Sequence, residues 1–219
     1  MEAVDTPEIV AALQRAADRM MELRDLLNRL DAALGDGDTG ITVGKIAAGI
    51  QAYVQEHAPE DDLGSFFIKL GMAVNQAASS SLGTLVATAL MRAGKESQGQ
   101  AWLDADTLAR MLRAADTGMQ QRGKAQPGDK TIIDAVHPAV EAFSASVEQG
   151  KGLAVAANEM LEAARAGRDS VIPLRSRIGR ASWVGERTEG QPDPGTVMFV
   201  QVLEAVLRAP HTEPGSTLG

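Results

Sequence analysis

Residues 5–30, DTPEIVAALQRAADRMMELRDLLNRL, decide the fold class of this chain of 219 residues. Asp5 and Thr6 stand directly before Pro7, and a capping side chain followed by proline is typical of a helix start. The apolar side chains that follow recur at alternating steps of four and three residues, which places them on one face of a helix. They are Ile9, Leu13, Ala16, Met20, Leu23, Leu27 and Leu30. We therefore predict a long amphipathic helix with one buried face.

The composition favours helices throughout the chain. Hydrophobic residues make up 44% of the sequence but aromatic residues only 3%, whereas a sheet is usually enriched in aromatic and β-branched side chains. The predicted fold is all-α. Helical patterns occur at residues 5–30, 42–56, 61–74, 82–93, 104–122, 131–147, 153–166 and 196–208. We expect one domain over residues 1–209, a long functional loop at 167–195, and a disordered tail at 210–219.

Composition and charge argue against several classes of function. The chain has no cysteine, which excludes disulfides and thiolate chemistry and suits a reducing compartment. Its start lacks the pattern of a signal peptide and no apolar run approaches the ~20 residues of a membrane span, so we expect a cytoplasmic protein. A net charge of −8 argues against nucleic acid and anionic membranes as partners. A phosphate-bearing substrate would therefore need a locally cationic site.

Residues 30–40, LDAALGDGDTG, place Asp31, Asp36 and Asp38 close together among glycines. Hard divalent cations take oxygen ligands, and Mg²⁺ commonly joins protein carboxylates to substrate phosphates. The stretch therefore predicts a metal–phosphate site, with a solvated acidic turn as the alternative. The glycine spacing also matches a dinucleotide-binding loop, but a helical pattern precedes it instead of the required strand. An EF-hand is excluded because Ile41 and Ala47 occupy the positions where its loop needs Gly and Glu.

Three further loops carry residue types that a nucleotide site needs. Ser79 and Ser80 offer hydroxyls at a helix start, although a simple N-cap explains them equally well. Residues 123–131, GKAQPGDKT, offer close backbone approach and the two cations Lys124 and Lys130, or form a plain interhelical loop. Residues 179–190 place Arg180 and Arg187 in a glycine-bordered loop, where they suit phosphate binding or form surface ion pairs. Residues 193–195, DPG, lead into the last helix, whose N-terminus attracts anions.

Together these blocks resemble a known family. The segments LDAALGDGDTG (30–40), RGKAQPGDKT (122–131), and GRASWVGER (179–187) with DPG (193–195) stand in the order found in the nucleotide-binding L subunit, or Dak2-type domain, of dihydroxyacetone kinases. The resemblance spans nearly the whole chain. It implies a barrel of eight antiparallel amphipathic helices with ADP or ATP bound at one end.

The resemblance also implies roles for individual residues. Two Mg²⁺ ions would be held by Asp31, Asp36 and Asp38. From the chemistry of phosphoryl transfer, we expect Arg180 to be catalytic and to steady the charge that develops during the reaction. The nucleotide would be bound by Thr39, Gly40, Ile41, Thr42, Ser79, Ser80, Gly123, Ile132, Arg180, Asp193, Pro194 and Gly195, with Ile132 as an apolar wall for adenine. The segment around Ser79 and Ser80 is a few residues shorter than in familiar members.

The implied function is phosphoryl transfer to dihydroxyacetone or a related short sugar that a separate K-type subunit holds, so the chain alone would be inactive. The donor has two candidates. Members that use the phosphoenolpyruvate phosphotransferase system keep ADP bound and receive phosphate from a DhaM-like partner; they typically have Gly-Asp-Ala-Asp-His-Gly. Gly37 and Thr39 instead resemble the ATP-using members. A non-enzymatic role, with the nucleotide state controlling a regulator, is a third hypothesis. The sequence leaves the oligomeric state open, with a homodimer as one option.

Overall fold

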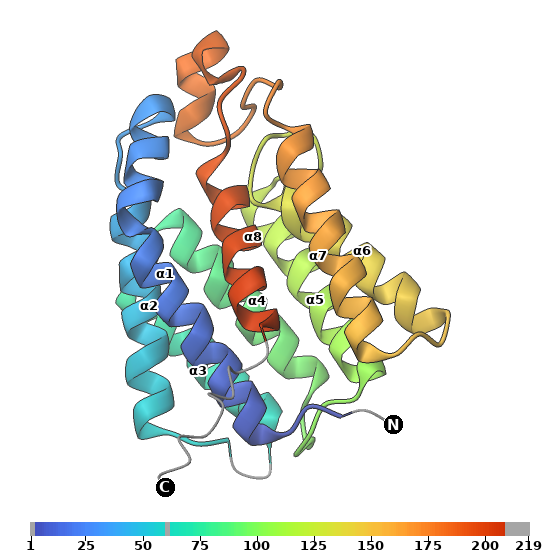
Figure 1. Ribbon diagram of the computed structural model, residues 1–219. Helices are drawn as coiled ribbons and strands as arrows, with labels where there is room; N and C mark the ends of the chain where they lie inside the picture. Colours follow the sequence, from blue (N-terminus) through green and yellow to red (C-terminus); the bar gives the residue numbers. More distant parts are fainter. Residues whose placement is uncertain (1–2, 60–61, 209–219) are drawn as a thin grey trace, which may run out of the picture.

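The computed structural model describes residues 3–59 and 62–208, and within them it is all-α, as predicted (Figure 1). The described residues form eight α-helices and one 3-10 helix, η1. Their bounds are α1 (Thr6–Leu34), α2 (Thr39–Glu56), α3 (Leu63–Ala77), α4 (Ser81–Glu96), α5 (Ala105–Gly123), α6 (Ile133–Glu148), α7 (Leu153–Ser170), η1 (Arg180–Thr188) and α8 (Pro194–Leu207). The predicted tail at 210–219 lies outside the described residues, and its disorder stays a prediction.

The helices form a closed ring. Each helix packs against the next one along the chain, and α8 returns to pack against both α7 and α1 (Figure 1). Because successive helices run in opposite directions, the connections after α1, α3, α5 and α7 lie at one end of the barrel. Segments far apart in the sequence therefore meet at this end. The barrel expected from the family resemblance is confirmed.

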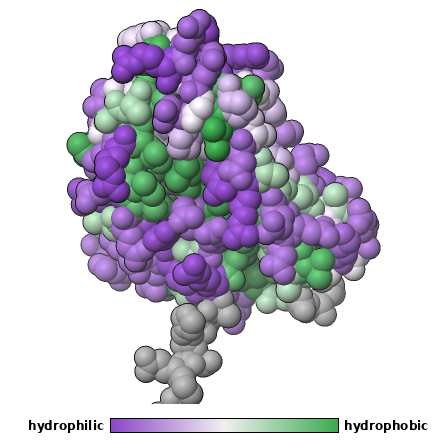
Figure 2. Space-filling view, turned by 45° about the horizontal axis from the view of Figure 1, so that its top comes forward, coloured by the Kyte–Doolittle hydropathy of each residue, from purple (hydrophilic) through white to green (hydrophobic). Residues whose placement is uncertain are grey.

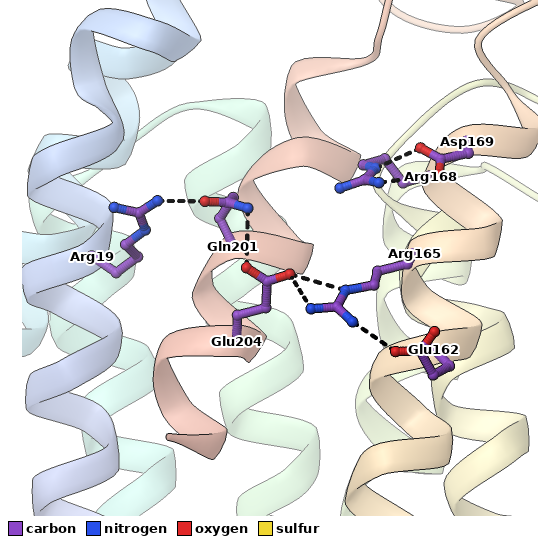
Figure 3. A network of polar contacts seen from close by, with 7 residues as sticks. All are labelled: Arg19, Glu162, Arg165, Arg168, Asp169, Gln201 and Glu204. Atoms are coloured by element: carbon purple, nitrogen blue, oxygen red, sulfur yellow. Dashed lines mark hydrogen bonds and ion pairs between the residues drawn. The ribbon is translucent and has the colours of Figure 1, made fainter. Parts of the chain in front are cut away.

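Polar side chains tie the last helix to its two neighbours at the point where the ring closes (Figure 3). Arg19 of α1 donates a hydrogen bond to Gln201 of α8, whose amide donates to Glu204 at 3.1 Å. Arg165 of α7 donates to the same Glu204 carboxylate from Nε at 3.0 Å and from Nη2 at 2.7 Å. Both Arg165 donors share Oε1 of Glu204, and the other carboxylate oxygen accepts from Gln201, so one Glu204 oxygen bonds to the neighbouring α7 and the other to α8 itself. This network fixes α8 between the first and seventh helices.

Helix starts follow the local sequence closely. Five side chains accept hydrogen bonds from backbone N–H groups of the first turn that they precede, and each such cap stabilises a helix by about 1 kcal/mol. They are Asp5, Asp62, Ser80, Asp104 and Asp193. Helix ends follow the sequence less well, because α4 continues to Glu96, past the predicted end at residue 93, and α7 to Ser170, past residue 166. A Cβ on Gly94 would lie 2.8 Å from the Gly64 carbonyl oxygen, so this glycine serves close packing between α3 and α4.

Apolar side chains line the interior of the barrel, and the surface is largely polar. Leu27, Ile46, Leu63 and Leu70 are completely buried. Figure 2 shows hydrophilic residues over most of the visible face, around a central group of apolar ones. An apolar cavity of about 590 Å³ lies inside the barrel, away from the end that the α1–α2 turn occupies. Among the described residues, no helix combines the length and hydrophobicity that crossing a membrane requires.

Candidate functional site

A cleft of about 260 Å³ opens at the end of the barrel where the four connections meet. Its walls come from the α1–α2 turn (residues 35–38), the starts of α2, α4 and α8, the α5–α6 loop, and residues 171–193 between α7 and α8, which we call the arm. Most of the predicted site residues line it. They are Asp31, Asp36, Asp38, Thr39, Thr42, Ser80, Ile132, Arg180, Asp193, Pro194 and Gly195.

The three aspartates of the acidic turn converge in this cleft. Carboxylate oxygens of Asp31, Asp36 and Asp38 all lie within 4.8 Å of one another. Asp31 belongs to the last turn of α1, and its Oδ2 accepts hydrogen bonds from the N–H groups of Asp38 at 2.9 Å and Thr39 at 3.0 Å. Gly37, with a φ of +75°, makes the tight turn that brings the chain back. Because like charges so close together repel, this arrangement favours binding of a cation.

Arg180 of η1 reaches across the cleft to the acidic turn. Its guanidinium pairs with Asp36 and lies 3.5 Å from the Asp38 carboxylate. The Arg180 side chain is 60% exposed and that of Asp36 47%, so the contact stays accessible to solvent and to ligands. An arginine so placed has donors for a carboxylate or for a phosphate oxygen. In the ligand-free protein the same contact is an ion pair at the surface, which is the alternative that the sequence left open for Arg180.

The start of α2 differs from the phosphate-contacting helix terminus that the resemblance implies. The N–H of Gly40 donates to the side-chain oxygen of Asn28 at 2.7 Å, and Asp31 takes the N–H of Thr39. A Cβ on Gly40 would lie 1.9 Å from the Arg24 carbonyl oxygen, so this glycine allows α1 and α2 to touch. Ile41 is 48% exposed, and neither Gly40 nor Ile41 belongs to the cleft lining. Thr39 and Thr42 do line it.

The α3–α4 junction shows the N-cap that sequence analysis left open. The Ser80 hydroxyl accepts a hydrogen bond from the N–H of Gly83 at 3.1 Å and so caps α4. Ser80 also lines the cleft, as does Ser81, which was not predicted. Ser79 is exposed and does not belong to the lining.

A second pocket of about 530 Å³ continues from the cleft between α4, α5 and the α5–α6 loop. Gly123 contributes to this pocket and not to the cleft, whereas Ile132 borders both. Leu85 and Met119 add apolar surface from α4 and α5. The polar cleft and the more apolar pocket thus form one continuous depression.

Lys130 is one of the two cations that the 123–131 loop could offer to a phosphate, but its ammonium group is bonded within the protein. Its side chain is only 2% exposed, and Nζ donates to the carbonyl oxygens of Ile172 at 2.9 Å, Leu174 at 2.8 Å and Thr188 at 2.5 Å. Burial lowers the pKa of Lys130, while the charges of Asp193 and Glu189 oppose this shift. The ammonium group donates three hydrogen bonds to these carbonyl oxygens, which lie near both ends of the arm. Lys130 therefore connects the two ends of the arm and has no donor left for a phosphate. Lys124, the other predicted cation, is exposed at the end of α5.

The arm is also held by its own hydrogen bonds. Thr188 is completely buried, and its hydroxyl accepts from the N–H of Ser176 at 3.0 Å while donating to the Gly185 carbonyl at 2.8 Å. Arg175 pairs with Glu186 at 2.9 Å and with Glu189 at 3.1 Å. The arm therefore presents Arg180 from a compact support.

Asp193 lies where the arm enters α8, and its carboxylate accepts from the N–H of Thr196 at 2.7 Å. Burial raises the pKa of Asp193 to about 7; the nearby Asp134 adds to this shift, whereas hydrogen bonding to Thr196 and the charge of Lys130 oppose it. With Asp31, Asp36 and Asp38, four aspartates line the cleft, against two cations. This excess of carboxylates would repel a polyphosphate, so a bound cation would favour its entry.

Comparison with protein-family models gives a match to the DAK2 domain over residues 33–208. The chain belongs to the DAK2 domain family. This DAK2 domain is 32% identical over 203 residues to the Escherichia coli (strain K12) "PEP-dependent dihydroxyacetone kinase, ADP-binding subunit DhaL", a match that covers 91% of this chain and 95% of that subunit. It is 30% identical over 195 residues to the Homo sapiens "Triokinase/FMN cyclase", covering 89% of this chain and 34% of that protein.

A solved structure has the same fold as this DAK2 domain. The native dihydroxyacetone kinase of C. freundii matches with a TM-score of 0.73 and 25% sequence identity, over 93% of this chain and 35% of that one. A second crystal structure of that kinase, in complex with AMP-PNP and Mg²⁺, matches with a TM-score of 0.69 at 24% identity. The DAK2 domain spans about a third of the length of these larger relatives.

Several residues that support the site of this DAK2 domain were not predicted. Thr188 was not singled out, and neither was Asn28. Asp134 is buried and accepts from the N–H groups of Gly128 at 2.5 Å and Thr131 at 2.8 Å, which shapes the α5–α6 loop. Asp134 is a charged residue beside turn-rich sequence, which was the available signal. Its partners are set by folding.

Proposed function

We propose that this DAK2 domain is the nucleotide-binding, phosphoryl-transferring subunit of a kinase for dihydroxyacetone or a related short-chain ketose. The observation that carries the proposal is the convergence of Asp31, Asp36 and Asp38 with Arg180 in one cleft. The relatives support the same chemistry, since their names describe an ADP-binding kinase subunit and a triokinase. We expect the protein to act in the cytoplasm.

The three aspartates fit Mg²⁺ as ligands. They supply only oxygen donors, and the turn places those oxygens within 4.8 Å of one another. We propose that Asp31, Asp36 and Asp38 together hold two ions. When bound, Mg²⁺ would neutralise the phosphate charges and orient the terminal phosphate.

We propose that the nucleotide phosphates occupy the cleft and that adenine occupies the adjoining pocket. Thr39 and Thr42 are the candidates for hydroxyl contacts to phosphate, in preference to the backbone amides of Thr39 and Gly40, which already have acceptors. Ile132, at the border of the two spaces, would pack against the base. The start of α8 at residues 193–195 adds the positive end of a helix dipole.

Arg180 is proposed as the catalytic residue. Mg²⁺ at the acidic turn would compete with Arg180 for the oxygens of Asp36 and Asp38, so the guanidinium would become available to phosphate oxygens. Phosphoryl transfer depends mainly on positioning and on stabilising the charge of the transferring group, a role that suits arginine. No covalent nucleophile on this chain is required.

The acceptor hydroxyl is proposed to arrive on a K-type subunit that holds the ketose, so this domain alone should transfer no phosphate to sugar. ATP is the proposed donor. The alternative is ADP that stays bound and is rephosphorylated by a DhaM-like protein, which the name of the PEP-dependent E. coli relative favours. The protein can be dialysed and then mixed with ATP and the K-type subunit. If it retains ADP and transfers no phosphate from the added ATP, the alternative is favoured.

The metal-bridged site is tested by calorimetric titration with ADP and Mg²⁺. We expect binding to be abolished by EDTA and by Asp36→Asn or Asp38→Asn, because phosphate would then face carboxylates without a bridging cation. Asp25→Asn, which changes an exposed aspartate of α1 outside the cleft, is the matched control and should bind like the wild type. Unchanged affinity both in EDTA and in the cleft variants would refute the proposal.

A further inference from the structure

Two neighbouring side chains of η1 have very different surroundings. Arg180 pairs with the acidic turn inside the cleft. Trp183, one turn later, is 86% exposed, the highest value among the large hydrophobic residues of the described chain. Exposed tryptophan leaves a large apolar surface in water, and aromatic residues of this kind are enriched in protein–protein interfaces. The remaining question is what covers Trp183.

The backbone beneath Trp183 is firmly supported. Lys130 binds the carbonyl oxygens at both ends of the arm, and the buried Thr188 bonds to Ser176 and Gly185. The arm forms the uppermost part of the molecule in Figure 1, beyond the ends of the helices. A backbone that is preorganised in this way loses little further freedom when the side chain that it presents binds a partner.

The cleft restricts what can meet this surface. For phosphoryl transfer, an acceptor must come within bonding distance of a phosphate in the cleft, and Gly179, Arg180 and Ala181 of the arm line that cleft. Trp183 does not belong to the lining and is exposed, so a molecule that approaches the cleft from outside can contact it without displacing the nucleotide. The larger relatives contain about twice as much chain outside the matched region as within it, which is enough for a domain that carries the acceptor.

We propose that Trp183 is the main anchor by which this domain docks onto the subunit that carries the acceptor, an inference that rests on the proposed kinase function. The contact surface on that subunit should be an apolar recess. We expect acidic residues at its edge, because Arg187 is exposed and has no ion pair among the described residues. Docking at Trp183 would bring the acceptor beside Arg180, three residues away on the same short helix.

The first test is steady-state kinetics with the K-type subunit from the same organism, Mg-ATP and dihydroxyacetone. Trp183→Ala should raise the apparent KM for the K-type subunit by about 30-fold, as for an interfacial hot spot, and leave kcat at saturation and ADP affinity unchanged. Trp183→Phe should restore most of the loss. The matched control is Trp102→Ala, which removes the second of the two tryptophans, 46% exposed at the other end of the barrel, and should have no effect.

A second test does not depend on turnover. In Trp102→Phe, Trp183 is the single tryptophan, and its fluorescence should shift to shorter wavelength and resist acrylamide quenching when the K-type subunit is added. If sedimentation shows that the complex forms but the tryptophan spectrum is unchanged, the inference is overturned. Weaker ADP binding by Trp183→Ala in the absence of the K-type subunit would also overturn it. Failure of the kinase proposal would appear separately, as absent metal-dependent ADP binding in the wild type.

Discussion

The acidic turn and the arm both reach the cleft, but they are built in opposite ways. The turn has four residues between α1 and α2, and its geometry depends on Gly37 and on hydrogen bonds to Asp31, all close in sequence. The arm is much longer, and its shape depends on Lys130, which lies 42 to 58 residues from the carbonyl groups that it binds. Arg180 joins the two regions.

This difference separates two requirements of the site. The turn concentrates negative charge where a divalent cation is proposed to bind, and local sequence suffices for that. The arm supplies a cation from the opposite wall, and its placement depends on a buried ammonium group with three carbonyl partners. Variants of the turn should therefore change ligand binding, whereas variants of Lys130, the buried support of the arm, should change stability and turnover together.

The largest effect is expected where the two regions meet. Arg180→Ala should lower kcat by about 1,000-fold with the K-type subunit present, because the charge of the transferring phosphate loses its arginine. The free energy of unfolding should change by less than about 1 kcal/mol, since the Arg180 and Asp36 side chains are largely exposed. Kinetics and urea unfolding measure the two quantities.

Arg175→Ala is the control for Arg180, because it removes an arm arginine that pairs with Glu186 and Glu189 outside the cleft. Its kcat should stay within about threefold of wild type, a difference below 1 kcal/mol. Equal losses in the two variants would show that arm structure, and not the Arg180 charge at the cleft, controls turnover.

The next effect concerns the support of the arm. Lys130→Met should lower the free energy of unfolding by about 3 kcal/mol, because three buried carbonyl groups lose a charged donor. Proteolysis within residues 171–193 should become faster. Lys124→Met is matched to it, since Lys124 also has a positive φ but is exposed, and it should unfold like the wild type.

The smallest effect is expected at the end of the arm. Asp193 has a raised pKa of about 7 in the native protein, so the folded state keeps a proton that the unfolded chain releases above about pH 4. Protonated Asp193 therefore contributes its full share to the free energy of unfolding below the pKa of the unfolded chain, and this contribution is lost as pH rises through 7. Relative to Asp193→Asn, which keeps a cap for α8, the ligand-free wild type should lose about 2 kcal/mol between pH 5 and pH 8. Parallel urea-unfolding curves at these pH values would contradict this.

Local sequence predicted most of the fold. The capping residues Asp5 and Asp104 mark helix starts because a side-chain oxygen satisfies nearby N–H groups, and this interaction lies within one turn. Gly94 was wrongly placed in a loop because glycine weakens an isolated helix, whereas here it allows α3 and α4 to touch. The ring of helices came from the family resemblance and not from periodicity.

The candidate site was predicted in part, because some of its contacts are local in sequence and others depend on tertiary packing. Asp31, Asp36 and Asp38 are close in sequence, so their convergence followed from the turn. The sequence left open whether Lys130 offers a cation to phosphate or belongs to a plain interhelical loop, and in the structure its ammonium group lies among carbonyl oxygens of the arm. Nothing near Lys130 in the sequence indicates those acceptors.

The sequence by itself determined the amphipathic helices, their capped starts and the acidic turn, because these features depend on side chains three to eight residues apart. Only the tertiary structure decided which polar groups remain available to a ligand. Asn28 accepts a hydrogen bond from the N–H of Gly40, and Lys130 donates to carbonyl oxygens of the arm, so neither group is free to bind a ligand. Arg180, by contrast, reaches the cleft, and Trp183 is exposed to solvent. The physical reason is that each buried polar group must find a partner, and the partner depends on which segments pack together.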